Sequence, residues 1–288
     1  MDTVEKKKVT GKTEETLKAW NRIDAEYYCS TGSEGFNGIA AEKKNRTEPK
    51  ESRSGAEKTA AGRSAALILA AGRSSRMQAE IPKQFLLYRG RPLFLWSVEK
   101  YRRIVDLTVV VTGEADVEKT RNCLASFGMD DVPVIPGGEE RYDSSFRGLL
   151  YLEEKGGFDT VMIHDAARAF VTEEIIRSAL ESAKQQGTAV AAVPLKDTVK
   201  RADEKGLVLD TPDRSSLYLI QTPQAFSLEL ILACYRWFFA EKEKHPALSV
   251  TDDASVVEQF SDHPVQLTPG SYDNIKITTP DDLKWLRE

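Results

Sequence analysis

The sequence predicts an α/β protein with a doubly wound, mostly parallel sheet of the Rossmann type, a projecting β-arm and a polar N-terminal extension. Two observations lead to this prediction. The composition changes sharply near Ser64, and from Ala65 onward short apolar runs alternate with amphipathic stretches. Alternation of strands with helices is typical of a parallel sheet that helices cover on both faces. We therefore expect an extension over residues 1–64 and one large α/β domain over residues 65–288.

The extension is poor in residues that build a core. It holds five Ile, Leu or Val residues before Ser64, and its second half is rich in Lys, Glu and Ser. Such a composition buries too little apolar surface to offset the entropy lost on ordering the chain. We expect a disordered tail. Apolar residues between Leu17 and Tyr27 lie at near-helical spacing, which leaves a short docking helix as the alternative.

Five apolar runs are the expected strands of the sheet. Helical patterns lie between them, and one starts at Pro92, a residue suited to the first turn of a helix. The alternation breaks over residues 196–226, where short strands and turns predict an arm that leaves the sheet. The strands are expected at residues 65–70, 107–112, 132–135, 160–164 and 188–193.

The charge balance limits the classes of partner. The chain has 45 acidic and 40 basic residues and a formal charge of −5, which argues against a general nucleic-acid or membrane-surface binder. Three scattered cysteines form neither a metal-ligand nor a disulfide pattern, and no stretch of the sequence approaches transmembrane length. We expect a cytoplasmic protein, or a plastid protein only if the extension is a transit peptide.

A candidate phosphate-binding loop, AAGRSSRM (70–77), follows the first expected strand. In open parallel sheets, ligands bind at the carboxyl ends of the strands, and small residues let backbone N–H groups approach phosphate oxygens. The further glycines of a dinucleotide fingerprint and the Gly-Lys-Ser/Thr of a P-loop are both missing. An ordinary strand-to-helix turn is the alternative, but Arg76 and Lys83 downstream favour a loop that binds a triphosphate.

The segment LAAGRSSRMQAEIPKQF (69–85) resembles the signature of the cytidylyltransferases that act on sugar-alcohol phosphates, most closely the branch acting on 2-C-methyl-D-erythritol 4-phosphate. The signature of the family contains an arginine in this loop, and Arg76 rather than Arg73 occupies its position. One such motif is weak evidence, whereas eight motifs in the same order as in the family are specific. They cover residues 65–288 and none of the extension. The other matches are GGEERYDS (137–144), HDAARAF (164–170), KDTVKR (196–201), DR (213–214), QTPQAF (221–226), TDDAS (251–255) and DNIKITTPDDL (273–283).

The resemblance implies a nucleotidyltransferase that transfers CMP from CTP to 2-C-methyl-D-erythritol 4-phosphate and releases pyrophosphate, in non-mevalonate isoprenoid biosynthesis. A phosphate monoester is already an anionic nucleophile, so this reaction needs positioning and charge stabilisation rather than a general base. By resemblance, Arg76, Lys83 and Lys276 are the catalytic cations. The nucleotide-binding residues that the resemblance implies are Ala70, Ala71, Gly72, Gly138, Glu139, Ser144, Asp165 and Ala166.

Other positions resemble those that gather the polyol phosphate. Arg214 would come from a partner subunit, because the family's arm exchanges contacts across a homodimer. The family has proline where this chain has Ala169. Alanine leaves the backbone torsion φ free and restores an N–H donor, so we expect a modest change in the direction of the neighbouring Arg168 side chain. The implied polyol-phosphate residues are Arg168, Thr198, Arg214, Thr222 and Thr251.

Two aspartates, Asp165 and Asp273, resemble the metal ligands of the family. Carboxylates, phosphate oxygens and waters are the ligands that Mg²⁺ prefers, so Mg²⁺ is the expected cofactor and CTP the co-substrate. A helix N-cap is the alternative role for Asp165. His164 is expected to pack or to hydrogen-bond rather than to act as a base.

Three other functions compete with this interpretation. Ribitol-5-phosphate cytidylyltransferases tend to show HDSVRP and GG-x-x-RN, where this chain has HDAAR and GGEERYDS. A non-catalytic nucleotide-binding module should have lost some of the implied cations and carboxylates, all of which are present. A NAD-dependent oxidoreductase would need a second and third glycine in the loop. The expected partners are the two small-molecule substrates and a second copy of the chain, with neither nucleic acid nor membrane.

Overall fold

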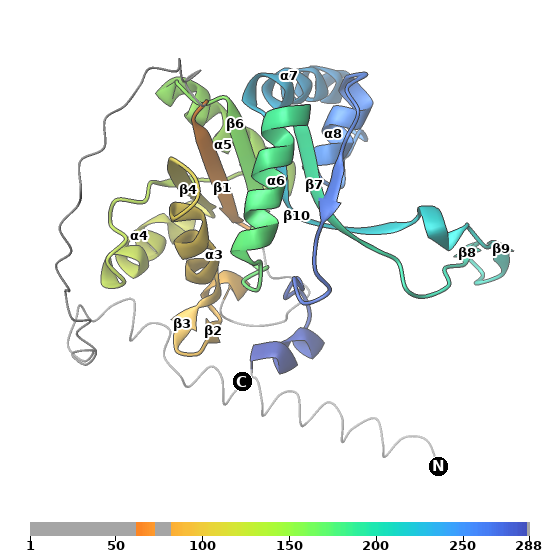
Figure 1. The fold of residues 1–288 in the computed structure, drawn as a ribbon, viewed down its shortest axis with the longest axis horizontal. Coiled ribbons are helices and arrows are strands. Elements are labelled where there is room, and N and C mark those ends of the chain that lie inside the picture. The colour runs from red at the N-terminus through yellow and green to blue at the C-terminus, as the bar shows by residue number, and fades with distance from the viewer. Residues whose placement is uncertain (1–61, 73–81, 287–288) are drawn as a thin grey trace, which may run out of the picture.

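The computed structural model describes residues 62–72 and 82–286 (Figure 1). A seven-stranded sheet in the order β11-β7-β10-β6-β1-β4-β5 forms its centre. Four of the six neighbouring pairs are parallel, and the two pairs made by β10 are antiparallel, which confirms the predicted mostly parallel α/β fold. The strands are β1 (Ser64–Ala70), β4 (Leu107–Thr112), β5 (Val134–Pro136), β6 (Thr160–Asp165), β7 (Thr188–Pro194), β10 (Tyr218–Ser227) and β11 (Leu267–Pro269).

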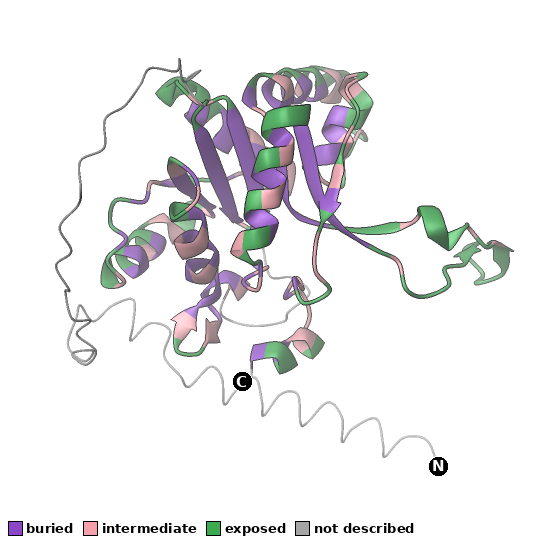
Figure 2. Ribbon diagram, viewed as in Figure 1, coloured by how far each residue is buried: buried purple, intermediate pink, exposed green. Residues whose placement is uncertain are grey.

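Helices cover both faces of this sheet. The strands form a buried inner layer in Figure 2, and β1 is buried along its whole length because β4 and β6 flank it. A strand in that position needs a continuous apolar run such as SAALILA, rather than alternating polarity. One face packs against α3 (Leu93–Arg102), α4 (Val117–Ser126) and α6 (Glu173–Gln186), and the other against α5 (Arg141–Lys155), α7 (Leu228–Lys244) and α8 (Asp253–Phe260).

Local sequence fixes where the helices begin and end. Thr172 caps α6 by accepting a hydrogen bond from the Ile175 N–H at 3.3 Å, and Gly187 caps its other end just after Gln186, with a φ of +79° that suits glycine. The helix expected from Pro92 starts at Leu93. Pro92 itself lies in β3 (Arg91–Pro92), which pairs with β2 (Leu87–Tyr88). The 3₁₀ helices are η1 (Lys83–Phe85), η2 (Glu114–Asp116), η3 (Arg214–Ser216) and η4 (Pro280–Leu286).

Strand β1 begins at Ser64, one residue before the predicted domain boundary at residue 65. Ser64 pairs with Thr160 of β6, and Asp106 Oδ2 also accepts hydrogen bonds from the Ser64 N–H at 2.7 Å and from its hydroxyl at 3.2 Å. The Arg63 carbonyl oxygen also accepts hydrogen bonds from the N–H groups of Asp159 and Thr160. All five expected strands are present, although β5 begins two residues later than predicted. The expectations for residues 1–61, the docking helix included, lie outside the described residues.

The arm projects from the body in Figure 1, with the hairpin of β8 (Arg201–Ala202) and β9 (Val208–Asp210) near its tip. Its predicted range, 196–226, is wrong at the far end. Residues 218–220 are exposed, whereas residues 221–226 are buried inside the sheet, where β10 pairs with both β6 and β7. One strand therefore runs from the arm into the core, and the QTPQAF motif belongs to the core.

No helix in the described ranges combines the length and the apolar character needed to cross a membrane.

Candidate active site

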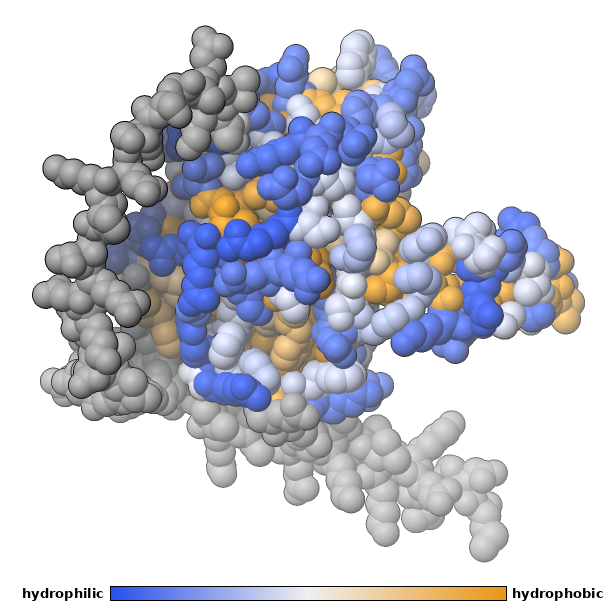
Figure 3. Space-filling view, viewed as in Figure 1, coloured by the Kyte–Doolittle hydropathy of each residue, from blue (hydrophilic) through white to orange (hydrophobic). Residues whose placement is uncertain are grey.

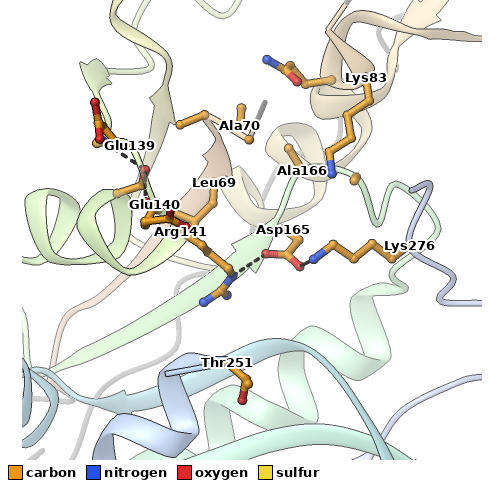
Figure 4. Close-up of a pocket in the computed structure, with 16 residues that line it drawn as sticks. Leu69, Ala70, Lys83, Glu139, Glu140, Arg141, Asp165, Ala166, Thr251 and Lys276 are labelled. Carbon is orange, nitrogen blue, oxygen red and sulfur yellow. Dashed lines mark hydrogen bonds and ion pairs between the residues drawn. The ribbon is translucent and has the colours of Figure 1, made fainter. Parts of the chain in front are cut away.

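A cavity of about 290 Å³ lies at the carboxyl ends of the neighbouring strands β1 and β6. The loops that follow β1 and β5, η1, the start of α5 and the segments before α8 and η4 complete its wall. Figure 4 shows Lys83 and Lys276 approaching Asp165 and Ala166, with Arg141 on the other side of Asp165. The predicted site residues that line the cavity are Ala70, Ala71, Gly72, Lys83, Gly138, Glu139, Ser144, Asp165, Ala166, Thr251 and Lys276.

A glycine turn shapes one wall. A Cβ at Gly137 would lie 2.6 Å from Ser144 Oγ, and a Cβ at Gly138 would lie 2.2 Å from the Cβ of Asp143, so only glycine fits both positions without rearrangement. The Gly138 N–H donates a hydrogen bond to Ser144 Oγ at 3.1 Å. Reciprocal capping by Glu140 and Asp143 fixes the start of α5 beside this turn. The wall is therefore rigid, with its backbone groups already in place.

The charged centre of the cavity is Asp165, the last residue of β6. Its Oδ1 lies 3.0 Å from Nε of Arg141, and its Oδ2 lies 2.6 Å from Nζ of Lys276. Burial alone would raise the pKa of the Asp165 carboxyl, but the charges of Arg141 and Lys276 outweigh burial and hold that pKa well below its usual range. Asp165 is thus an ionised carboxylate with a cation on each oxygen.

Arg141 extends this arrangement away from the cavity. Its Nη1 lies 2.7 Å from Oδ2 of Asp253, a fully buried carboxylate whose Oδ1 accepts a hydrogen bond from the Tyr235 hydroxyl at 2.6 Å. Lys276, Asp165, Arg141 and Asp253 form what we call the ion-pair chain. Burial alone would lower the pKa of Arg141, but Asp253 and Asp165 raise it, so this guanidinium is permanently charged.

Sequence reasoning missed Arg141 and Asp253, although both lie inside quoted motifs. Arg141 is the first residue of α5. A cation in the first turn of a helix opposes the helix dipole, which favours acidic residues there. That anomaly was the available signal for Arg141, whereas the pairing of Asp253 depends on how α8 packs against α5 and has no signal in the local sequence.

Lys83 reaches the cavity from η1. A Cβ at Gly72 would lie 3.9 Å from Lys83 Nζ, so the lysine ammonium lies beside the backbone at the start of the loop after β1. Backbone N–H groups and a lysine at one place suit a bound phosphate. Arg76, the other expected cation of this loop, and Arg73 lie outside the described residues.

Thr222 and His164 lie next to Asp165, and neither side chain lines the cavity. The Thr222 hydroxyl accepts a hydrogen bond from the Asp165 N–H at 3.1 Å and contacts His164 Nδ1 at 3.1 Å. His164 Nε2 contacts the Ser97 hydroxyl at 3.3 Å. Burial lowers the pKa of His164 to about 3, so its ring is neutral and links α3 to β10. This agrees with the expected hydrogen-bonding role of His164 and places Thr222 behind Asp165.

Arg168 and Asp273 lie near the cavity without lining it. The Arg168 guanidinium donates to the carbonyl oxygens of Asn274 at 2.7 Å and Ile220 at 3.4 Å, so it connects the end of β6 with the loop before Lys276. Asp273 is exposed, and its N–H donates to Ser271 Oγ at 3.1 Å.

The remaining predicted residues lie further out. Ala169 is buried in an apolar cluster with Leu93 and Ile277. Thr198 and Arg214 are exposed on the arm, where Arg214 donates to the Lys196 carbonyl oxygen at 2.7 Å. The described part of this one chain therefore does not bring those two arm residues to the cavity.

The donor set bears on the expected metal. Within residues 62–72 and 82–286, no cluster of three or more His, Cys, Asp or Glu side chains could hold an ion by itself. Asp165 presents one carboxylate to the cavity, and Mg²⁺ is commonly held by one or two carboxylates together with substrate phosphates and waters. A single carboxylate of this kind fits an ion that arrives together with bound phosphates.

Comparison with known proteins gives consistent matches. A family model described as 2-C-methyl-D-erythritol 4-phosphate cytidylyltransferase matches residues 64–286. Relatives of that name from Clostridium botulinum (strain ATCC 19397 / Type A) and Bacillus velezensis are each 40% identical over 220 residues, which is 75% of this chain and 93% and 91% of theirs. A solved 4-diphosphocytidyl-2C-methyl-D-erythritol synthase from Anaerococcus prevotii DSM 20548 has a TM-score of 0.67 at 30% identity, covering 78% of this chain and 95% of that one. The corresponding Francisella tularensis cytidylyltransferase has a TM-score of 0.63 at 29% identity, covering 77% and 97%.

Proposed function

This chain belongs to the 2-C-methyl-D-erythritol 4-phosphate cytidylyltransferase family, and from that premise we propose which of its residues perform the reaction. The reaction transfers CMP from CTP to 2-C-methyl-D-erythritol 4-phosphate and yields 4-diphosphocytidyl-2-C-methyl-D-erythritol and pyrophosphate, in isoprenoid biosynthesis. The observation that carries the proposal is the convergence of Lys83 and Lys276 beside Asp165, at the carboxyl ends of β1 and β6.

CTP occupies the cavity with its base on the glycine turn and its phosphates on the β1 loop. Gly138, Glu139 and Ser144 contact cytosine, since backbone groups held by the start of α5 can discriminate a pyrimidine edge without moving. The ribose and phosphates lie along Ala70, Ala71 and Gly72, with Asp165 and Ala166 at the end of β6.

The chemical step is an attack by a phosphate oxygen of the polyol phosphate on the α-phosphorus of CTP. The bond from the α-phosphorus to the bridging oxygen breaks, and pyrophosphate leaves with that electron pair. Negative charge grows on the transferring group and on the leaving group, so fixed cations lower the barrier. Lys83 and Lys276 supply cations from the described residues, and Arg76 completes the set that we assign to catalysis.

Asp165 is the residue that we assign to Mg²⁺ binding, together with the phosphate oxygens of CTP. When bound, the ion neutralises charge on the phosphates. Each carboxylate oxygen has two lone pairs, so Asp165 can accept from Lys276 and Arg141 and still bind a cation. Asp273 is the second ligand that we propose by resemblance, and its exposed side chain would have to turn toward the cavity.

The polyol phosphate binds beside CTP, near Thr251 and the loop that Arg168 supports. Thr251 lines the cavity directly, and Thr222 acts behind Asp165. Thr198 and Arg214 lie on the arm, so we assign them to the active site of a partner subunit. This assignment explains why an exposed arm carries residues of a phosphate-binding type.

We propose a homodimer held by the arm. Figure 3 shows hydrophobic side chains along the arm and at its tip, where Leu207 and Leu209 are 65% and 62% exposed. Large apolar side chains exposed on a projecting element indicate a protein contact. The double variant Leu207→Asp, Leu209→Asp is expected to change the mass in light scattering from dimer to monomer and to lower kcat/KM about 10-fold or more.

Leu150→Asp is the matched control for the arm, because Leu150 is an exposed leucine of α5 with 38% exposure. It is expected to leave both the mass and the activity unchanged. A doubly substituted arm that stays dimeric and fully active would contradict the proposed arm contact.

The catalytic unit that we propose starts at Gly62 rather than at residue 65. The Arg63 carbonyl oxygen accepts hydrogen bonds from Asp159 and Thr160, and Ser64 belongs to the central strand β1, so a shorter chain would lose contacts at the start of that strand. A chain that starts at Gly62 is expected to keep kcat within about threefold of the full chain, since every described site residue is retained. Loss of activity with an unchanged melting temperature would contradict this boundary.

CTP is an intracellular nucleotide, so we place the reaction in the cytoplasm. The described cysteines, Cys123 and Cys234, are both buried free thiols, as a reducing compartment allows.

Release of pyrophosphate tests the function directly. The full chain is incubated with CTP and Mg²⁺ and, in separate reactions, with 2-C-methyl-D-erythritol 4-phosphate or ribitol 5-phosphate. Pyrophosphate is expected in the first reaction at a kcat/KM at least 10-fold above the second, since a site loses about 1–3 kcal/mol when a substrate group does not fit. A preference for ribitol 5-phosphate would overturn the substrate, and CTP binding without turnover would favour a binding module.

A further inference from the structure

Asp253 is a buried charge behind the cavity. It is the first residue of α8, its side chain is fully buried, and it lies two residues after the cavity-lining Thr251. Its two oxygens meet the Tyr235 hydroxyl at 2.6 Å and Nη1 of Arg141 at 2.7 Å. It therefore joins α5, α7 and α8 at one point.

The folding of α8 does not require this charge. Asp252 already caps the helix by accepting a hydrogen bond from the Ser255 N–H at 3.0 Å, and Gln224 Oε1 accepts a hydrogen bond from the Ala254 N–H at 2.9 Å. A buried ion pair is a poor source of stability, because removing two charges from water costs about as much as their attraction returns. The Asp253 carboxylate is better explained by what it does to Arg141.

Arg141 transmits that contact to the cavity. The guanidinium is planar and rigid, so fixing Nη1 on Asp253 also fixes the direction of Nε, which lies 3.0 Å from Asp165. Asp165 in turn holds Lys276 at 2.6 Å. The ion-pair chain thus runs from the core of α7 and α8 to an ammonium group that faces the phosphates in the proposed function.

We propose that Asp253, with Tyr235 behind it, is a positioning residue of the active site. It does not touch substrate. By fixing Arg141, it prevents Arg141 from competing with Lys276 for Asp165, and so keeps the Lys276 ammonium at the reacting phosphates. Its effect is on where the Lys276 ammonium lies relative to the charge that develops in the transition state.

Asp253→Asn tests the proposal, because asparagine keeps the size and removes the charge. Kinetics are measured with the full chain, well below the melting temperature of each variant. We expect kcat to fall about 10-fold or more, since small misplacement of a catalytic group has effects of this size. The KM for CTP is expected to change less, because Asp253 makes no contact in the cavity. Asp253→Glu, which keeps the charge, is expected to recover part of kcat.

Tyr235→Phe gives a second, milder variant for the case in which Asp253→Asn does not fold. It removes one hydrogen bond to Asp253 and is expected to lower kcat about fivefold. Thr188→Val is the matched control for destabilisation, because the buried Thr188 hydroxyl donates to the Pro264 carbonyl oxygen at 2.8 Å, at the start of β7 and away from the cavity. It is expected to lower the melting temperature without changing kcat.

The outcomes separate the roles. Unchanged kcat in Tyr235→Phe and in folded Asp253→Asn would overturn the proposal, as would an equal loss of kcat in Thr188→Val. Because the proposal rests on the role assigned to Lys276 above, Lys276→Met is measured alongside. Lys276→Met could keep full activity while Asp253→Asn and Tyr235→Phe lose theirs. That result would remove Lys276 from the catalytic residues of the proposed function, and it would leave Asp253 as the residue that positions Arg141.

Discussion

Replacing Lys83 with methionine is expected to lower kcat roughly 100-fold or more and to leave the Kd for CTP nearly unchanged. Methionine keeps most of the side-chain volume and removes the ammonium. If Lys83 meets charge that grows only in the transition state, its loss raises the barrier without weakening the ground-state complex. Single-turnover rates at saturating substrates, together with a direct titration of CTP binding, measure the two quantities on one variant.

Two further variants make the Lys83 result decisive. Lys83→Arg keeps a charge in a different geometry and should rescue the rate only in part. Lys119→Met removes an ammonium that packs 4.7 Å from the centre of the Phe85 ring, close to η1 but outside the cavity lining, and should leave the rate unchanged. A Lys83→Met protein with a normal single-turnover rate and weak CTP binding would make Lys83 a ground-state contact.

Asp165→Asn is expected to damage both stability and turnover. Asparagine leaves Lys276 without its carboxylate and leaves Arg141 paired with Asp253 alone. Breaking a buried ion pair costs about 3 kcal/mol at the low end of measured values. For a domain of this size that corresponds to a drop in Tm of roughly 6–12 °C. We expect kcat at saturating Mg²⁺ to fall about 100-fold, because the Lys276 ammonium is no longer held in place.

The pH dependence of stability checks the ionisation of Asp165. The pKa of its carboxyl is lower in the folded protein than in the unfolded chain, so its contribution to stability is present above the unfolded pKa of about 3.9 and is lost as pH falls toward the folded pKa. The difference in Tm between wild type and Asp165→Asn should therefore shrink as the pH falls below about 4. A difference that stays constant through this pH range would show that folding does not lower the pKa of the Asp165 carboxyl.

Much of the fold follows from local sequence. β1 and β6 are continuous apolar runs, so their burial on both faces and the position of the cavity at their ends can be predicted. The far end of the arm could not be predicted, because the residues of β10 look like a short strand whether they pair in the arm or in the sheet. Only the partners of a strand decide which of the two it joins, and those partners are β6 and β7.

The site shows the same division. Lys83 and Lys276 could be named from motifs, because each motif carries its residue types at fixed spacing. Asp253 could not, since its role exists only where α8 meets Arg141, more than a hundred residues earlier in the chain. Contacts between distant elements have no periodicity to reveal them, and a buried carboxylate in a helix start looks like an ordinary cap.

The two ends of the arm meet at a single step of the β-ladder. Pro194 on β7 and Tyr218 on β10 are paired residues, and the Leu195 N–H donates to the Leu217 carbonyl oxygen at 2.9 Å just beyond them. The arm is therefore a long hairpin loop whose base is closed, and its length does not affect the register of the sheet. Lengthening a loop costs free energy only with the logarithm of its length. Insertions and deletions in the arm can therefore accumulate without disturbing the sheet or the cavity of the same chain, and in the proposed homodimer the limit on them is that Thr198 and Arg214 still reach the partner subunit.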